Sequence, residues 1–160
     1  MAIRELFFNP YTKKDGNYGI IQGKPFSNRE RPNGVEKHDD HLHVASDNMD
    51  EIVKIMNKAK DMGFMVHENP YATAMGWDPG GVQRNEHTPT SYHSREFSQK
   101  YKKDGKEYTV GNAVDINWTK GGQSEETEKL TDFINNYLYK EIVPNPAPSQ
   151  NSMVSSKMDS

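Results

Sequence analysis

Three short strings in this 160-residue chain contain side chains that bind divalent metal ions. They are Asp40-His41-Leu42-His43, Ser91-Tyr92-His93 and Gly111-Asn112-Ala113-Val114-Asp115. Imidazole nitrogen and carboxylate oxygen are ligands that zinc accepts, and two histidines with one carboxylate leave a tetrahedral zinc with one open position. A hydrolase needs that position for its water. The three strings together therefore predict a zinc site, whereas each string alone is a weak signal.

Predicted strands have to bring these side chains together. An extended segment is expected from Val35 to Ala45, where alternation places His41 and His43 on the same face. A mostly apolar strand is expected from Ala113 to Trp118, and the carboxylate of Asp115 within it needs compensation by charge, hydrogen bonds or a metal ion. The alternatives are two solvated imidazoles on a surface strand, and an Asp115 that serves only as a helix cap or salt-bridge partner.

The remaining pattern predicts an α+β fold, with a small antiparallel sheet flanked by two main helices and the zinc site on the sheet. The expected elements are short strands near Phe7-Phe8 and from Tyr18 to Ile21, a helix from Asp47 or Asn48 to Met62, a strand from Phe64 to His67, a loop over 68–90 with Trp77 as an anchor or substrate-lining residue, a hairpin of Phe97 to Tyr101 and Glu107 to Val110, and a helix capped by Ser124 and ended by Pro144. Residues 1–144 are thus expected to form one domain, and 145–160 a flexible tail or linker.

The composition excludes several classes of protein. The net charge of -3 comes from 20 basic and 23 acidic residues that are well interspersed, so no basic face for nucleic acid is expected. The chain has no cysteine, and therefore neither a disulfide nor a thiolate metal site. The first residues lack the apolar core of a signal peptide, and no run approaches the ~20 apolar residues of a membrane span.

The three strings together resemble the D-alanyl-D-alanine carboxypeptidase and dipeptidase family of zinc peptidases, which includes the L-alanyl-D-glutamate endopeptidases of phage endolysins. That family carries Ser-x-His-x-x-Gly-x-Ala-x-Asp, followed by an acidic residue three positions before a second His. The resemblance implies a hedgehog/D-Ala-D-Ala peptidase-like fold in which His43, His93 and Asp115 bind zinc. It also implies that Asp40 is the general base, and His41 is then expected to orient the water or stabilise the tetrahedral intermediate.

Two features of spacing and order differ from the family. His93 and Asp115 lie 22 positions apart here rather than seven, and the predicted hairpin within 94–110 accounts for the insertion. The segment with the acidic residue and second His comes first in this chain rather than last. We interpret this order as a circular permutation, which is feasible where termini lie close together. It predicts that the strand over 35–46 pairs beside the strand of Asp115.

A third difference concerns an arginine that the family carries shortly before Ser-x-His. The expected position has none, and Arg84 or Arg95 would have to replace it from the loops. Asp39 is the alternative general base, although strand alternation directs its side chain to the opposite face. The other histidines match nothing in the family and are expected to be surface or supporting residues: His38, His67 and His87.

The function implied by the resemblance is a zinc metallopeptidase that cleaves peptidoglycan stem peptides at an L,D or D,D bond, as a cell-wall lytic enzyme of a bacteriophage or bacterium. Its partners would be peptidoglycan and proteins of a phage virion or tail. The chain would be made in the cytoplasm without a signal peptide and then released to the cell wall, or carried in a virion. The alternatives are a non-catalytic structural or wall-binding module of the same fold, and another zinc hydrolase such as an amidase.

Overall fold

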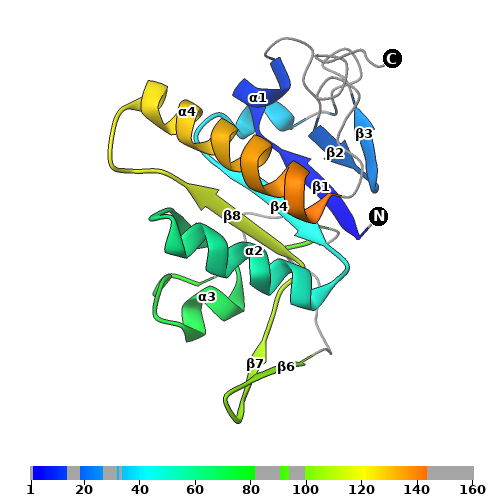
Figure 1. Ribbon diagram of the computed structural model, residues 1–160, viewed down its shortest axis with the longest axis vertical. Coiled ribbons are helices and arrows are strands. Elements are labelled where there is room, and N and C mark those ends of the chain that lie inside the picture. Colours follow the sequence, from blue (N-terminus) through cyan, green and yellow to red (C-terminus); the bar gives the residue numbers. More distant parts are fainter. Residues whose placement is uncertain are drawn as a thin grey trace.

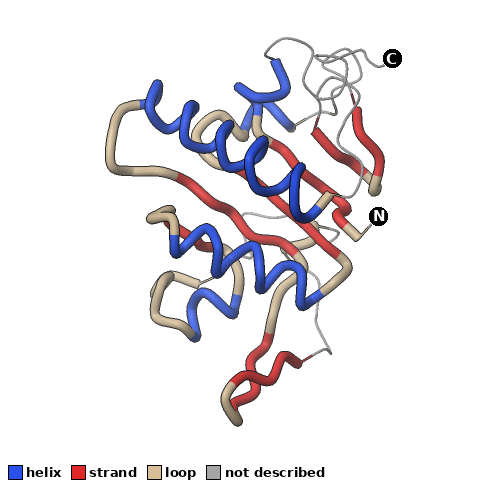
Figure 2. Tube along the Cα trace, in the orientation of Figure 1, coloured by secondary structure: helices blue, strands red, loops and turns tan. Residues whose placement is uncertain are grey.

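The computed structural model describes residues 2–13, 19–26, 32, 34–81, 91–93 and 100–143 (Figures 1 and 2). Its helices and strands are β1 (Ile3–Phe7), α1 (Asn9–Lys13), β2 (Gly19–Ile21), β3 (Lys24–Phe26), the 3-10 turn η2 (Val35–Lys37), β4 (Leu42–Ser46), α2 (Met49–Asp61), β5 (Met65–His67), α3 (Pro70–Ala74), β6 (Lys100–Lys103), β7 (Lys106–Thr109), β8 (Ala113–Asn117), α4 (Gln123–Phe133) and the π-helix η4 (Ile134–Ile142).

Six of the strands form one sheet in the order β3-β2-β1-β4-β8-β5, with every neighbouring pair antiparallel. Strands β1 to β4 therefore lie side by side, and β8 and β5 complete the sheet beyond β4. In the register of β4 with β8, His43 pairs directly with Asp115. The predicted α+β fold with a small antiparallel sheet is confirmed, and so is the predicted pairing of the two strands that carry His43 and Asp115.

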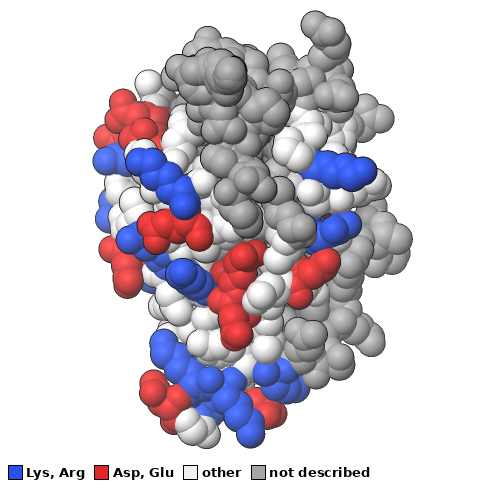
Figure 3. Space-filling view, turned by 45° about the vertical axis from the view of Figure 1, so that its right-hand side comes forward, with Lys and Arg blue, Asp and Glu red and all other residues white. Residues whose placement is uncertain are grey.

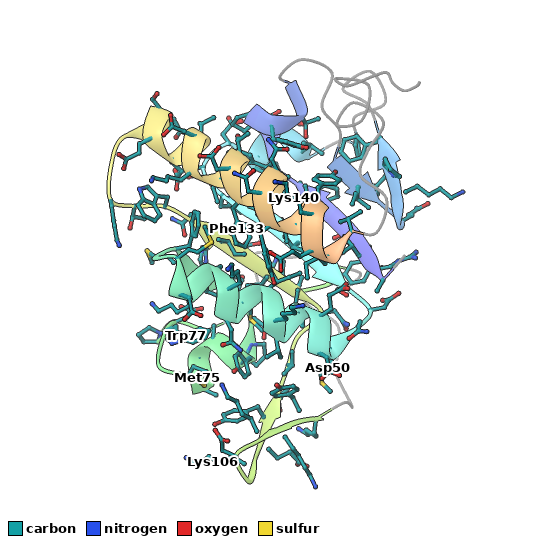
Figure 4. All side chains as sticks on the ribbon, in the orientation of Figure 1. Asp50, Met75, Trp77, Lys106, Phe133 and Lys140 are labelled. Carbon is teal, nitrogen blue, oxygen red and sulfur yellow. The ribbon has the colours of Figure 1, made fainter. Side chains whose placement is uncertain are left out.

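Helices α2 and α4 both cover the same face of this sheet (Figure 1). The side chains that alternate toward them are apolar and fully buried, among them Val44 of β4 and Val114 of β8. Phe133 of α4, labelled in Figure 4, packs into this core against Phe64, with the two ring centroids 5.2 Å apart. Since side chains alternate along a strand, His43 and Asp115 are directed to the opposite face.

Helix α2 follows from its sequence almost residue for residue. Asn48 caps it, because its side chain accepts a hydrogen bond from the backbone N–H of Glu51. The buried residues recur at helical spacing and pack on the sheet: Ile52, Val53, Ile55, Met56 and Ala59. Gly63, just beyond the end, has φ 94, a left-handed conformation that glycine adopts without strain. The predicted helix is confirmed to within a residue at each end.

The C-terminal helix differs from its prediction at its start. It begins at Gln123 with Gly122 in the capping position and no capping side chain, so the predicted cap by Ser124 is wrong. From Ile134 the helix continues with π geometry, and Val143 donates to the carbonyl of Leu138. Pro144 and the predicted tail lie outside the described residues. Within the described part of the chain, no helix combines the length and apolar character needed to span a bilayer.

Two segments, one before α2 and one after β5, differ from their predictions. The segment predicted to be extended from Val35 to Ala45 becomes a strand only from Leu42, where β4 (Leu42–Ser46) begins, because the 3-10 turn η2 and a bend precede it. The predicted loop after His67 contains helix α3, which the sequence signals through a capping Asn69 followed by Pro70 at the first helical turn.

The predicted hairpin is present as the separate two-stranded sheet β6-β7, which extends away from the main sheet (Figure 1). Its two-residue turn has positive φ at Asp104 (52°) and Gly105 (77°), the conformation that matches the twist of a hairpin. Tyr101 and Tyr108 pack their rings against Tyr71. The lysines of the hairpin gather with acidic side chains at the lower end of Figure 3. Residues 97–99 of the predicted first strand lie outside the described residues.

Candidate metal centre

Three buried side chains from three separate segments meet on the face of the sheet opposite the helices. Nδ1 of His43 lies 3.1 Å from Nε2 of His93 and 3.3 Å from Oδ1 of Asp115. Nε2 of His93 lies 3.0 Å from the same Asp115 oxygen. All three residues are at most 7% exposed. The group can hold a metal ion, since its ligand atoms lie within 4.8 Å of one another. These are the three ligands predicted from the sequence.

The outer nitrogens of the two imidazoles are already engaged. Nε2 of His43 lies 2.7 Å from a carboxylate oxygen of Glu5, and Nδ1 of His93 lies 3.1 Å from the backbone carbonyl of Glu68. Both partners are acceptors, so in the neutral imidazoles these outer nitrogens carry the hydrogen. The inner nitrogens then present lone pairs toward the carboxylate of Asp115. Three acceptors that converge in this way require a cation between them, either a proton or a metal ion.

Protonation of His43 provides that cation when no metal is bound. Burial alone would lower the pKa of His43, but hydrogen bonds and charge from Asp115 and Glu5 outweigh it and raise the pKa to about 9. Burial would likewise raise the pKa of Asp115, and hydrogen bonds from His43 and His93 instead hold it well below its usual value. The carboxylates of Asp115 and Glu5 therefore stabilise a positive charge at this site, here the proton on His43.

Glu5 is the residue that sequence reasoning missed. It stands in β1 near the start of the chain, 38 positions from His43, and no motif marks it. The only local signal is a carboxylate in a strand whose neighbours Ile3 and Leu6 are fully buried. Its approach to His43 depends on the pairing of β1 with β4, which is a property of the sheet rather than of the local sequence.

A strained backbone residue orients His93. Glu68 has φ 64, an uncommon left-handed conformation for a residue with a side chain, and its own N–H donates to Asp78 at 3.1 Å. This conformation directs the Glu68 carbonyl to the His93 ring. Within the Ser-x-His string, the hydroxyl of Ser91 accepts a hydrogen bond from the backbone N–H of His93 at 3.2 Å.

Asn69 fixes the entry to the Asp115 strand. Its side chain is fully buried and donates to the carbonyls of Gly111 and Ala113, both at 2.9 Å, while it accepts from the N–H of Gly111 at 3.1 Å. The turn after β5 therefore positions both His93, through Glu68, and the Gly-x-Ala-x-Asp string, through Asn69. Sequence reasoning treated this turn as a loop.

No protein-family model, curated protein or solved structure matches this chain. The metal-binding arrangement accordingly stands on the geometry of the described residues, and its likeness to D-alanyl-D-alanine peptidases stays a resemblance of three sequence strings.

The two predicted catalytic residues form a pair beside the ligands. Oδ1 of Asp40 lies 3.0 Å from Nδ1 of His41, and Nε2 of His41 lies 3.8 Å from Oδ2 of Asp115. The Asp40 side chain is 72% exposed, whereas that of His41 is 24% exposed. The ring of His41 thus lies between Asp40 and Asp115. His41 and His43 both face this cluster, as the alternation of side chains predicted. Asp39 instead contacts the side chain of Asn9.

The other histidines of the sequence analysis lie at different distances from this cluster. The ring of His38 contacts those of His41 and His43, and burial with these two neighbours lowers its pKa to about 4, so it is a supporting residue of the site. The side chain of His67 instead hydrogen-bonds that of Asn117.

Among the arginines, Arg4 hydrogen-bonds Tyr92, which raises the pKa of the Arg4 guanidinium. Lying outside the described residues are Arg84, His87 and Arg95.

Proposed function

We propose that this protein is a zinc-dependent peptidase that cleaves the stem peptides of peptidoglycan at an L,D or D,D bond, as a wall-lytic enzyme of a phage or bacterium. The observation that carries the proposal is the convergence of two imidazole lone pairs and one carboxylate, with both outer nitrogens held by acceptors. Each ligand comes from a different segment, so the fold itself must be complete before the site exists.

The separations of the three ligand atoms support zinc as the ion. Tetrahedral zinc with bonds of ~2.0–2.1 Å would hold its ligand atoms about 3.3 Å apart. The three separations here, 3.1, 3.3 and 3.0 Å, are close to that value. Two histidines and a carboxylate are a donor set that catalytic zinc sites use with a fourth position left for water or substrate.

The Asp40–His41 pair is the proton acceptor of the proposed reaction. Bound zinc would supply Lewis acidity, which lowers the pKa of a water molecule to about 7 and polarises a peptide carbonyl. His41 directs Nε2 at Asp115 and holds Nδ1 against Asp40, so a proton taken beside the ligands can be retained by this pair and passed to the leaving amine. Exposure of Asp40 keeps the pair accessible from solvent.

The substrate class comes from the resemblance of the three strings, and the sheet order supports the permuted arrangement. Strands β1 to β4 are adjacent, and the chain leaves this four-stranded part of the sheet after Ser46. A permutation boundary directly after Ser46 would separate the strand of His43 from the later helices and strands without dividing any of them. The permuted peptidase fold is therefore part of the proposal, together with the release to the cell wall or the virion association that such an enzyme needs.

Digestion of purified cell walls tests the function directly. Mass analysis of the released muropeptides should show one stem-peptide bond cut by the zinc-loaded protein, and no cut by His93→Ala. Glu128→Gln, an exposed change on α4, is the control and should cut normally. Release of whole stem peptides from the glycan would identify an amidase instead. A zinc-loaded protein that cuts nothing would identify a non-catalytic module.

A further inference from the structure

Glu5 reaches the metal centre because strand β1 is irregular. Ile3 pairs with Ser46, but Glu5 pairs with Ala45, so two steps along β1 correspond to one step along β4. In a regular ladder Glu5 would share a face with Ile3 and Ser46, on the helix-covered side. The extra residue moves it to the face that bears His43, since a shift of one residue exchanges the two faces of a strand. Such bulges are found next to active sites, where they redirect side chains.

Strand β1 then holds the His43 ring from two sides. The Glu5 carboxylate lies 2.7 Å from Nε2, and the side chains of Glu5 and His43 are 22% and 6% exposed. Phe7, the direct pairing partner of His43, stacks on the imidazole with ring centroids 5.3 Å apart and planes at 19°. The stacked ring fixes the plane of the imidazole, and the carboxylate fixes which nitrogen faces outward.

We propose that Glu5 is a positioning residue of the metal centre, whose carboxylate orients His43 so that Nδ1 faces the ion and strengthens that nitrogen as a ligand through the Nε2–H hydrogen bond. Histidine ligands commonly donate their second N–H to a carboxylate or carbonyl, and loss of that partner typically costs ~10–100-fold in metal affinity. The inference rests on the proposed zinc site but not on peptidase activity.

Zinc affinity of the full chain, measured by competition with a chelator, tests the inference. Glu5→Ala should weaken zinc binding about 10–100-fold, and Glu5→Gln about tenfold, because its amide oxygen still accepts the hydrogen bond without the charge. Glu128→Gln is the matched control and should bind as the wild type does. In the zinc-loaded wild type, the Nε2 proton of His43 should give a protected NMR signal that is lost to exchange in Glu5→Ala.

Each outcome supports or overturns the role of Glu5. Unchanged zinc affinity and an unchanged Nε2 signal in Glu5→Ala would overturn it, as would an equal loss of affinity in Glu128→Gln. If Glu5→Ala does not fold, the same two measurements on Glu5→Gln, which keeps the shape of the side chain, take its place. A wild type that binds no zinc would overturn both this inference and the proposed metal. Zinc binding that depends on Glu5 without cleavage of cell walls would overturn only the proposed peptidase.

Discussion

The two imidazoles of the metal centre are held by different kinds of structure. His43 belongs to a central strand, where the side chains of Glu5 and Phe7 fix its ring. His93 belongs to the short segment 91–93, where the backbone carbonyl of Glu68 fixes its ring. We call these two arrangements the supports of His43 and His93. The support of His43 contains a formal charge, on Glu5, whereas the support of His93 is the dipole of a backbone carbonyl. We therefore expect charge to control how strongly His43 binds a metal ion, and backbone geometry to control where the His93 ring is placed.

The supports also differ in their origin along the chain. The one for His43 depends on the irregular register of β1, far away in sequence. The one for His93 depends on the turn after β5, in which Asp78 holds the strained Glu68. Changes at each support should accordingly have different magnitudes, and they follow here from the largest to the smallest.

Removal of a ligand should erase the difference between the two supports, because neither can act without the ion. His43→Ala, His93→Ala and Asp115→Ala should each abolish stoichiometric zinc binding, since two remaining ligands do not complete a site. Metal content of the dialysed proteins measures this, with the exposed Glu128→Gln on α4 as the control. Full zinc occupancy in any of the three variants would exclude that residue from the site.

A change beside the ligands should separate binding from catalysis. Asp40→Asn should retain zinc, because Asp40 contacts His41 rather than the ligand triangle, yet lose ~10²–10⁴-fold in peptide hydrolysis. Single-turnover rates on a stem peptide, together with zinc content, measure the two effects. Loss of zinc in Asp40→Asn with retention in Asp115→Asn would show that the two carboxylates have exchanged roles.

The charged support should make zinc binding dependent on pH. With its pKa raised to about 9, His43 of the metal-free protein is protonated at neutral pH, and zinc has to displace that proton. The Kd should therefore fall about tenfold per pH unit as pH rises toward 9 and level off above it. Chelator competition between pH 6.5 and 10 measures the profile. A Kd that is constant between pH 7 and 8.5 would refute the protonated state.

The backbone support should give the smallest effect. Asp78→Ala removes a hydrogen bond of 3.1 Å to the Glu68 N–H, which acts on His93 only through the Glu68 carbonyl. One hydrogen bond contributes about 1 kcal/mol, so zinc affinity should weaken at most about fivefold. The same zinc titration compares it with Glu5→Ala. A loss as large as that of Glu5→Ala would remove the distinction between the two supports.

The convergence of the three candidate ligands could be predicted because their residue types and local strings carry the signal. His43 and Asp115 stand in strands whose alternation is visible in the sequence, and helix α2 shows its cap and its apolar stripe directly. Local patterns of this kind are determined by neighbours a few residues away.

Glu5 could not be predicted because its position depends on a one-residue shift between two strands distant in sequence. The bend before β4 and the turn at Glu68 were missed for a related reason. Local sequence permits an extended chain before β4 and an irregular loop after β5. The observed conformations instead have contacts with residues distant in sequence, since the His38 carbonyl accepts from the N–H of Asn9 and the Glu68 carbonyl meets the His93 ring. The wrong cap at Ser124 reflects a helix that starts two residues earlier than predicted, with Gly122 in the capping position.

The central claim is that one zinc ion is bound by His43, His93 and Asp115. A crystal structure of the zinc-loaded protein, with diffraction data on both sides of the zinc absorption edge, tests it most directly. One anomalous peak is expected per chain, within ~2.0–2.2 Å of Nδ1 of His43, Nε2 of His93 and a carboxylate oxygen of Asp115. A peak elsewhere, or none at this cluster in zinc-saturated crystals, would contradict the account.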